Sequence, residues 1–318
     1  GDASERFGED ALRMLRAIRF AADLGFDLLP DVWDGILRRR GNLRLVAMER
    51  VGAEWDKMIA GAGPEQAMHY LFKSGLAAYL KEPLPDGFVR AAERYRLNGT
   101  SWQWDPWGVE TADEASSGNL TMLPSLADAD LRWAALLAGM KVGEEHAREL
   151  MRLLRLGSKR AERIGRVAGF FERTGGSEEA ARSAWIAAAL EYGRQTAEDA
   201  LQIVEACGDS ADRAREWLNG MAVGSVAELD VKGDELIRYL GRPPGPWVAE
   251  LLRKLLEEAA SGALPNEKFA LLDAAKEMVP NAVPVLRRAA DETGADQTEV
   301  ADMSATNKSE TDSMEDGT

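Results

Sequence analysis

The spacing of apolar residues is the feature that most restricts the fold of this chain. In segment after segment, apolar side chains recur at steps of three and four residues, as Leu12, Leu15 and Ile18 do, and a glycine or proline ends the run. This period places the apolar side chains on one face of an α-helix. The two-residue alternation that indicates β-strands is not evident. We therefore expect an all-α protein.

Composition narrows the class of protein further. The 318 residues are enough for more than one packed unit. Because no secretory signal and no apolar run of about 18 residues occur, we expect no membrane partner. The single cysteine, Cys207, excludes an intrachain disulfide and suits a reducing compartment, so we expect a cytoplasmic protein. One cysteine and two histidines also make a zinc site improbable.

The charge of the chain is distributed unevenly. The net charge of −15 argues against a nucleic-acid-binding protein. However, residues 141–182 carry ten Lys or Arg and seven Glu, and residues 291–318 carry nine acids and one lysine. A phosphate backbone responds to such local fields and not to the total. Residues 289–318 contain too few large apolar side chains to fold, so we expect them to be disordered.

The run that begins at Glu9 contains no glycine or proline before Gly25, so it predicts one continuous helix. On that helix Glu9, Asp10 and Arg13 would meet on one side, and Arg16 would continue it by one turn. A carboxylate beside a guanidinium offers an acceptor next to a donor, as reading the edge of a nucleobase requires. Glu9 would then orient Arg13. Spacing alone favours the simpler interpretation, a surface ladder of ion pairs.

A second group of charged residues surrounds the start of a later predicted helix, for which Ser158 is a candidate N-cap. Its cations are Arg155, Lys159, Arg160 and Arg163. Cations at a helix N-terminus oppose the helix dipole, which disfavours a purely structural role. They predict a phosphate-binding patch, with a solvated surface as an equally weighted alternative. The run Arg38-Arg39-Arg40 ends another helix, where capping is favoured over phosphate contact.

Several of these segments resemble the tRNA nucleotidyltransferases, the CCA-adding enzymes of the bacterial class II type that is related to poly(A) polymerase. Residues 1–26 resemble the template-helix region, and Leu45–Val51 resembles the segment that supports it. The turn Gly241–Trp247 and the segment Gly262–Lys268 resemble the family's tail. The resemblance implies an elongated array of helices with a neck at residues 1–62, a body at 63–222 and a tail at 223–288.

The resemblance also implies roles for the charged residues. The family's Glu-Asp-x-x-Arg motif, which selects CTP and then ATP, falls on Glu9, Asp10 and Arg13. Asp10 and Arg13 are thereby expected to contact the base, and Glu9 to brace Arg13. The implied RNA partner is the acceptor stem and T arm of tRNA. The residues expected to bind nucleotide are Glu9, Asp10, Arg13 and Arg16, and those expected to bind RNA are Arg155, Lys159, Arg160 and Arg163.

The catalytic part of the family is expected to lie outside this sequence. The chain opens on Gly1 without an initiator methionine, and it lacks the Gly-Ser phosphate-binding motif and the two Mg²⁺-binding aspartates of the family's head. We therefore expect no catalytic residue and no metal ligand here, with Mg²⁺ bound by the missing head. This would make the chain the nucleobase-selecting and tRNA-binding portion of a nucleotidyltransferase, inactive alone. The alternative is a stand-alone RNA-binding or scaffold module without catalytic activity.

Overall fold

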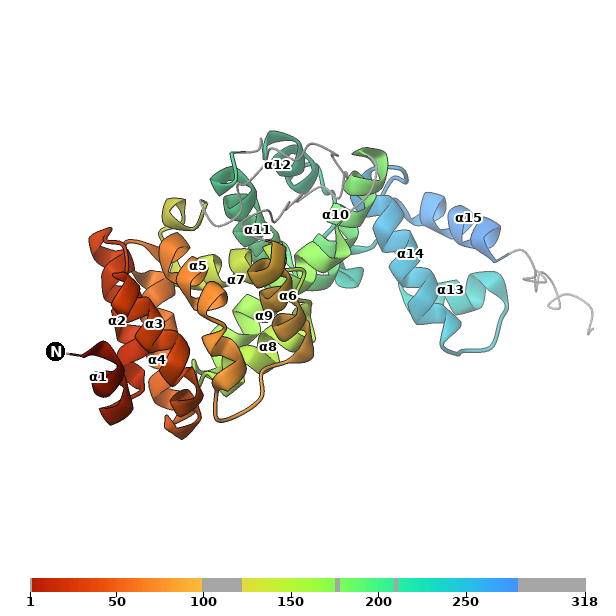
Figure 1. Ribbon diagram of the computed structural model, residues 1–318. Helices are drawn as coiled ribbons and strands as arrows, with labels where there is room; N and C mark the ends of the chain where they lie inside the picture. The colour runs from red at the N-terminus through yellow and green to blue at the C-terminus, as the bar shows by residue number, and fades with distance from the viewer. Residues whose placement is uncertain (1, 99–121, 175–177, 209–210, 280–318) are drawn as a thin grey trace, which may run out of the picture.

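A computed structural model of the chain describes residues 2–98, 122–174, 178–208 and 211–279 (Figure 1). Over these residues the chain forms fifteen α-helices and four short 3-10 helices, without any β-strand. The prediction of an all-α protein is thus confirmed. In the same described ranges no helix is both long and apolar enough to cross a membrane. The segment 289–318, which we expected to be disordered, lies outside the described residues.

The first half of the described chain folds into helices connected by short segments. Its elements, in order, are α1 (Ala3–Glu9), α2 (Leu12–Leu24), α3 (Pro30–Arg39), η1 (Arg40–Leu45), α4 (Met48–Ala60), α5 (Pro64–Ser74), η2 (Leu76–Tyr79) and α6 (Asp86–Asn98). The second half begins with η3 (Leu123–Ser125), α7 (Ala129–Gly139), α8 (Glu144–Leu153) and α9 (Ser158–Arg173). It continues with α10 (Glu178–Tyr192), α11 (Arg194–Ala206), α12 (Asp212–Asn219), η4 (Val226–Glu228), α13 (Gly233–Leu240), α14 (Trp247–Ser261) and α15 (Lys268–Met278).

The described helices form an elongated molecule (Figure 1). Their buried apolar side chains form two successive cores. The larger core extends without interruption from Phe7 in α1 to Leu218 in α12. The smaller one lies among α13, α14 and α15, and it also includes Ile186 of α10. The helices that carry Glu9 and those that carry Lys159 therefore share one core, and their relative positions are fixed by packing.

The predicted single helix from Glu9 to Leu24 is wrong, because the chain breaks at Asp10. This residue has extended backbone angles (φ −144°, ψ 105°), and α1 ends immediately before it. Its Oδ1 accepts a hydrogen bond from the backbone N–H of Leu12 at 3.1 Å, where α2 begins. Short polar side chains compete in this way with helical backbone bonds. The predicted end at Gly25 is confirmed, since that residue adopts the left-handed conformation (φ 68°).

Candidate nucleotide and nucleic-acid interface

Glu9 and Arg13 meet across the junction of α1 and α2. The Nη1 of Arg13 donates to Oε2 of Glu9 at 2.5 Å, and Arg6 donates to the same carboxylate at 3.3 Å. The hydrogen bonds from Arg13 and then Arg6 lower the pKa of Glu9. Arg13 also donates to the backbone carbonyl of Arg6 and remains 42% exposed. The guanidinium is therefore held from one side while its other side faces solvent.

Asp10 turns toward α4 instead of toward Arg13, so the expectation that all three side chains meet is wrong in this respect. Its Oδ2 accepts from Nη2 of Arg50 at 3.1 Å, and its Oδ1 accepts from Leu12. The extended backbone at Asp10 is the cause, because it rotates the side chain out of helical register with Arg13. Each oxygen holds one partner and keeps a lone pair, and the side chain is 29% exposed.

Arg16 lies one turn further along α2 and points to a buried carboxylate. The side chain of Glu54 on α4 is only 3% exposed, and its two oxygens accept from Arg16 at 3.4 Å and Arg19 at 3.0 Å. Lys57 approaches Oε1 at 3.4 Å. Burial acts to raise the pKa of Glu54, but the hydrogen bond from Arg19 and the charge of Lys57 outweigh it, so the pKa is lowered. The buried carboxylate of Glu54 thus orients the more exposed side chain of Arg16.

Arg160, predicted to bind phosphate, is engaged by carboxylates from two other helices. Its Nη1 and Nη2 each donate to Asp56 of α4 at 2.8 Å, and its Nε donates to Asp130 of α7 at 2.6 Å. Asp56 also accepts from the indole N–H of Trp133 at 3.0 Å. Burial acts to raise the pKa of Asp56, but the hydrogen bonds from Arg160 and Trp133 lower it by more. The pKa of Asp56 is therefore below its usual value.

Arg163 is compensated in the same way. It donates to Asp199 of α11 at 2.9 Å and to Asp128 at 2.6 Å. Carboxylates of the chain itself therefore compensate Arg160 and Arg163, without an external anion. The predicted N-cap is also wrong: Gly157 occupies that position, and Ser158 is the first residue of α9.

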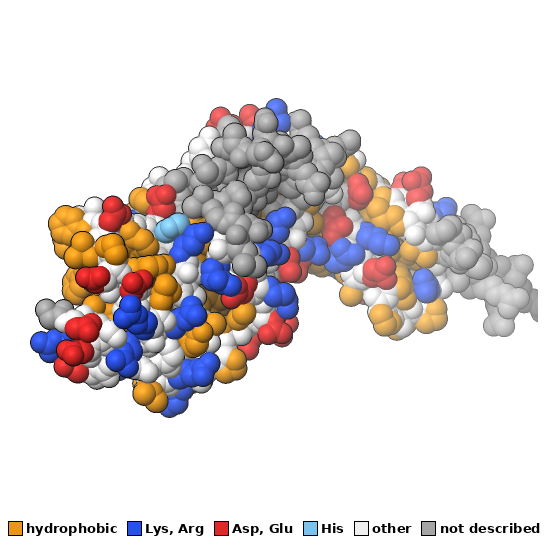
Figure 2. Space-filling view, viewed as in Figure 1, with side chains coloured by type: hydrophobic (Ala, Val, Ile, Leu, Met, Phe, Trp, Pro, Cys, Tyr) orange, Lys and Arg blue, Asp and Glu red, His pale blue; other side chains and the backbone are white. Residues whose placement is uncertain are grey.

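Arg155 and Lys159 are the more exposed members of the predicted patch. Arg155 has a left-handed backbone (φ 58°), and its guanidinium reaches Glu82 at 3.2 Å and Glu49 of α4 at 3.7 Å. Lys159 is exposed, and among the described residues it has no ion pair within 4 Å. Figure 2 shows Lys and Arg side chains interspersed with Asp and Glu over the N-terminal helices.

Helix α4 brings the two predicted sets of residues together. Its first turn carries Arg50, which holds Asp10, and the preceding Glu49, which pairs with Arg155. Its next two turns carry the partners of Arg16 and Arg160. Gly52 permits this arrangement, since a Cβ there would lie 1.9 Å from the carbonyl oxygen of Leu154. Sequence reasoning missed these carboxylate partners because most lie tens of residues away.

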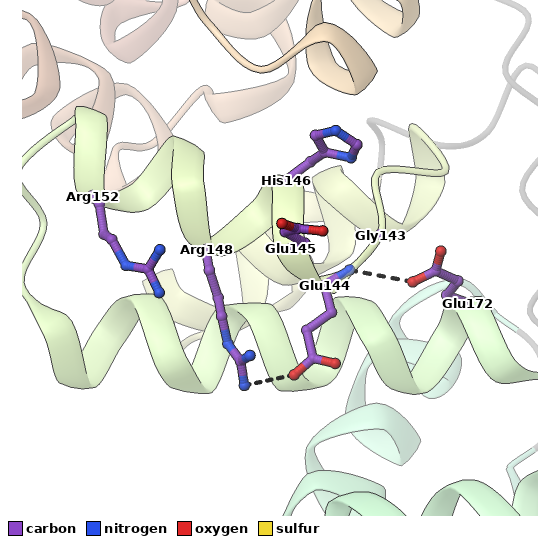
Figure 3. Close-up of a pocket in the computed structure, with 7 residues that line it drawn as sticks. All are labelled: Gly143, Glu144, Glu145, His146, Arg148, Arg152 and Glu172. Carbon is purple, nitrogen blue, oxygen red and sulfur yellow. Dashed lines mark hydrogen bonds and ion pairs between the residues drawn. The ribbon is translucent and has the colours of Figure 1, made fainter. Parts of the chain in front are cut away.

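A polar pocket of about 600 Å³ opens at the start of α8 (Figure 3). Glu172 accepts from the backbone N–H of Glu144 at 3.3 Å, and Glu144 pairs with Arg148 at 2.6 Å. Its polar groups therefore stabilise the first turns of α8. In the described parts of the chain, no cluster of three His, Cys, Asp or Glu residues is arranged to hold a metal ion. The pocket is lined by Gly143, Glu144, Glu145, His146, Arg148, Arg152 and Glu172.

Comparison with known proteins gives two family matches. Residues 125–275 match the family described as "tRNA nucleotidyltransferase domain 2 putative". Residues 25–86 match the family described as "Probable RNA and SrmB- binding site of polymerase A". The second match includes η1, α4 and η2, and the first includes α7 to α14.

Individual relatives agree with these matches. The CCA-adding enzyme of Geobacillus stearothermophilus is 28% identical over 274 residues, which are 84% of this chain and 60% of the relative. The CCA-adding enzyme of Bacillus cereus strain AH820 is 29% identical, with 84% and 61% covered. The crystal structure of the Bacillus stearothermophilus CCA-adding enzyme in complex with CTP has a TM-score of 0.61 and 27% identity. That match covers 87% of this chain and 64% of the other, so this chain spans about three fifths of these relatives.

Proposed function

Because the chain belongs to the tRNA nucleotidyltransferase family through that family's C-terminal helical domains, we propose that it serves in adding CCA to the 3′ end of tRNA. Its part in that reaction is to select the incoming nucleotide and to bind tRNA. The nucleotides are CTP and ATP, and the RNA contacts are made with the acceptor stem and T arm. Carboxylates of a nucleotidyltransferase head would hold Mg²⁺, which would supply charge neutralisation at the transferring phosphate.

The observation that supports nucleotide selection is that Arg13 and Asp10, three residues apart at the start of α2, each keep a partly exposed polar group, a donor on Arg13 and an acceptor on Asp10. Cytosine and adenine both present an exocyclic amino group next to an unprotonated ring nitrogen. Asp10 would accept from the amino group, and Arg13 would donate to the ring nitrogen. Uracil and guanine present a carbonyl oxygen next to a ring N–H. Their acceptor would then face the Asp10 carboxylate and their donor would face Arg13, so neither hydrogen bond could form. The same pair of side chains therefore favours C and A over U and G.

The surrounding contacts support this assignment. Glu9 restrains Arg13 on one side, and Arg50 restrains Asp10 from α4. Such restraints reduce the conformational freedom that would be lost when the base binds. In this proposal Arg16 lies at the edge of the nucleotide site, where Glu54 orients it.

For RNA we propose direct phosphate contacts by Lys159 and Arg155, the exposed members of the predicted patch. Arg160 and Arg163 approach RNA at the same end of α9, where their carboxylate partners fix them in position. A partly neutralised guanidinium binds phosphate less strongly than a free one. The affinity contributed by Arg160 and Arg163 should therefore be smaller than that contributed by Lys159.

The experiment that tests the proposal joins this chain to the head of a CCA-adding relative and supplies tRNA lacking its CCA end, CTP, ATP and Mg²⁺. We expect CMP and AMP to be incorporated. A folded fusion that binds tRNA but incorporates neither nucleotide would contradict the proposal. It would favour the alternative function, an RNA-binding or scaffold module without catalytic activity.

A further inference from the structure

The segment between Asp34 and Glu49 is strongly cationic. It contains four arginines, at positions 38, 39, 40 and 44, and no aspartate or glutamate. Arg38 and Arg39 lie in the last turn of α3, where cations complement the helix dipole. Arg44 lies beyond that helix, near the end of η1. Capping of α3 therefore accounts for only part of this run.

The structure places two of these arginines over one aromatic ring. The guanidinium carbon of Arg40 lies 4.9 Å from the centroid of Tyr79, and that of Arg44 lies 5.3 Å from it. Arg40 also donates to the backbone carbonyl of Ser74 at 3.2 Å, which anchors it. Tyr79 ends η2, which packs against η1. We call Arg40, Arg44 and Tyr79 the Arg–Tyr cluster.

In the described part of the chain, no nearby acid compensates the positive charge of the Arg–Tyr cluster. Among the described residues, neither Arg40 nor Arg44 has a carboxylate within 4 Å, although Arg38 pairs with Asp34 at 3.8 Å. This contrasts with the start of α9, where carboxylates surround Arg160 and Arg163. Two like charges held against one ring repel each other, and an anion between them would relieve the repulsion.

The chemistry of the Arg–Tyr cluster suits a nucleic-acid backbone. Both guanidinium groups lie over the tyrosine ring, which restrains them, and a restrained guanidinium can bind phosphate oxygens with two parallel hydrogen bonds. The cluster lies at the N-terminal end of α4, the end that carries Glu49 and Arg50. It is therefore on the same end of α4 as the contacts to Asp10 and Arg155.

We propose that the Arg–Tyr cluster is a phosphate-binding site for the backbone of the RNA substrate. It is separate from the predicted patch at the start of α9. This inference rests on the proposed function, because that function supplies the RNA. Arg44 makes the phosphate contact, Tyr79 holds its guanidinium plane, and Arg40 adds a second anchored charge.

The test measures binding of a tRNA transcript to the complete 318-residue chain by fluorescence anisotropy between about 25 and 200 mM KCl. For Arg44→Gln we expect about tenfold weaker binding at the lowest salt, and a slope of log K against log salt that is shallower by about 1. Tyr79→Phe keeps the ring and should bind as the parent does. Tyr79→Ala releases the guanidinium groups and should weaken binding severalfold. Thermal melting of each variant verifies that it is folded.

The matched control is Arg38→Gln, which removes a charge from the same segment. The side chain of Arg38 is 72% exposed and already pairs with Asp34. We expect its binding and salt slope to match those of the parent. If the Arg38 and Arg44 variants lose the same affinity for tRNA, the arginines attract the RNA only through their overall charge, and the site is refuted. If the parent binds tRNA and Arg44→Gln binds equally well, this site alone is refuted. If the parent does not bind tRNA at low salt, the proposed function is refuted together with the site.

Discussion

At the scale of single residues, Asp10 shows how far the sequence could predict the candidate site. The contact between Glu9 and Arg13 followed from their spacing of four, although the chain breaks between them at Asp10 and the two residues lie on different helices. The break at Asp10 did not follow, since an aspartate within a helix-forming run often stays helical. Its pairing with Arg50 joins residues forty positions apart, and local spacing carries no information about such a contact.

The contributions of the two Asp10 oxygens to stability can be distinguished by mutation. Asp10→Ala removes the hydrogen bond to Leu12 and the ion pair to Arg50, and should lower the free energy of unfolding by about 1–2 kcal/mol. Asp10→Asn keeps an oxygen for Leu12 and loses only a half-exposed ion pair, so it should cost about 0.5 kcal/mol or less. Urea denaturation measures both values. Equal losses would show that Oδ1 does not stabilise the start of α2.

His69 should make stability depend on pH. Burial, together with the charge of Lys73, lowers its pKa, and its Nδ1 lies 3.0 Å from the hydroxyl of Tyr95. Below about pH 6.5 the unfolded chain therefore binds a proton that the folded chain does not. The free energy of unfolding should fall as the pH is lowered from 7 to 5.5. His69→Gln should reduce this fall, and an unchanged pH dependence in the variant would contradict the assignment.

At the scale of elements, α4 connects α2, which carries Arg16, to α9, which carries Arg160, through ion pairs. The sequence of this helix shows apolar residues at helical spacing before a glycine-rich break, and the helix ends immediately before Gly61. The sequence did not predict which partners the charged face of α4 would meet, because Asp56, Arg160 and Asp130 come from three helices. Their meeting depends on the packing of those helices, which a pattern within one helix does not specify.

Gly52 should be essential for the packing of α4. Because a Cβ would lie 1.9 Å from the carbonyl oxygen of Leu154, Gly52→Ala must push α4 away from the end of α8. We expect a loss of about 2–3 kcal/mol in the free energy of unfolding. Gly41→Ala is the matched control, since nothing lies within 4 Å of its Cβ position, and it should change stability by about 0.5 kcal/mol at most. Similar effects of the two changes would contradict the close approach.

The ion pairs between α4 and α9 should stabilise the fold. Asp56→Asn weakens two hydrogen bonds to the partly buried Arg160, and should cost about 1–3 kcal/mol. Glu257→Gln, which removes the exposed pair with Arg253 in α14, should cost about 0.5 kcal/mol or less. Thermal denaturation at neutral pH distinguishes the two. If the Asp56 variant is as stable as the parent, Arg160 is not held by α4 and is available to phosphate.

At the scale of the whole molecule, periodicity predicted an all-α chain, and the structure confirms it. The resemblance predicted an elongated arrangement of helices. In the described residues, the buried side chains form two successive cores, as such an arrangement requires. Charge was harder to interpret, because the density of cations near Lys159 suggested a phosphate patch. The carboxylates that compensate Arg160 and Arg163 come from α4, α7 and α11. Net positive charge in one segment therefore does not identify a free surface.

Nucleotide choice by the chain joined to a relative's head is the most direct test of base reading by Arg13 and Asp10. We predict that Arg13→Ala and Asp10→Ala lose the preference for CTP and ATP over UTP and GTP by about tenfold or more, while tRNA affinity changes less than about twofold. Lys159→Gln should do the reverse, weakening tRNA binding and leaving the preference intact. If the Arg13 and Asp10 variants keep the parent's nucleotide preference, Arg13 and Asp10 do not read the base.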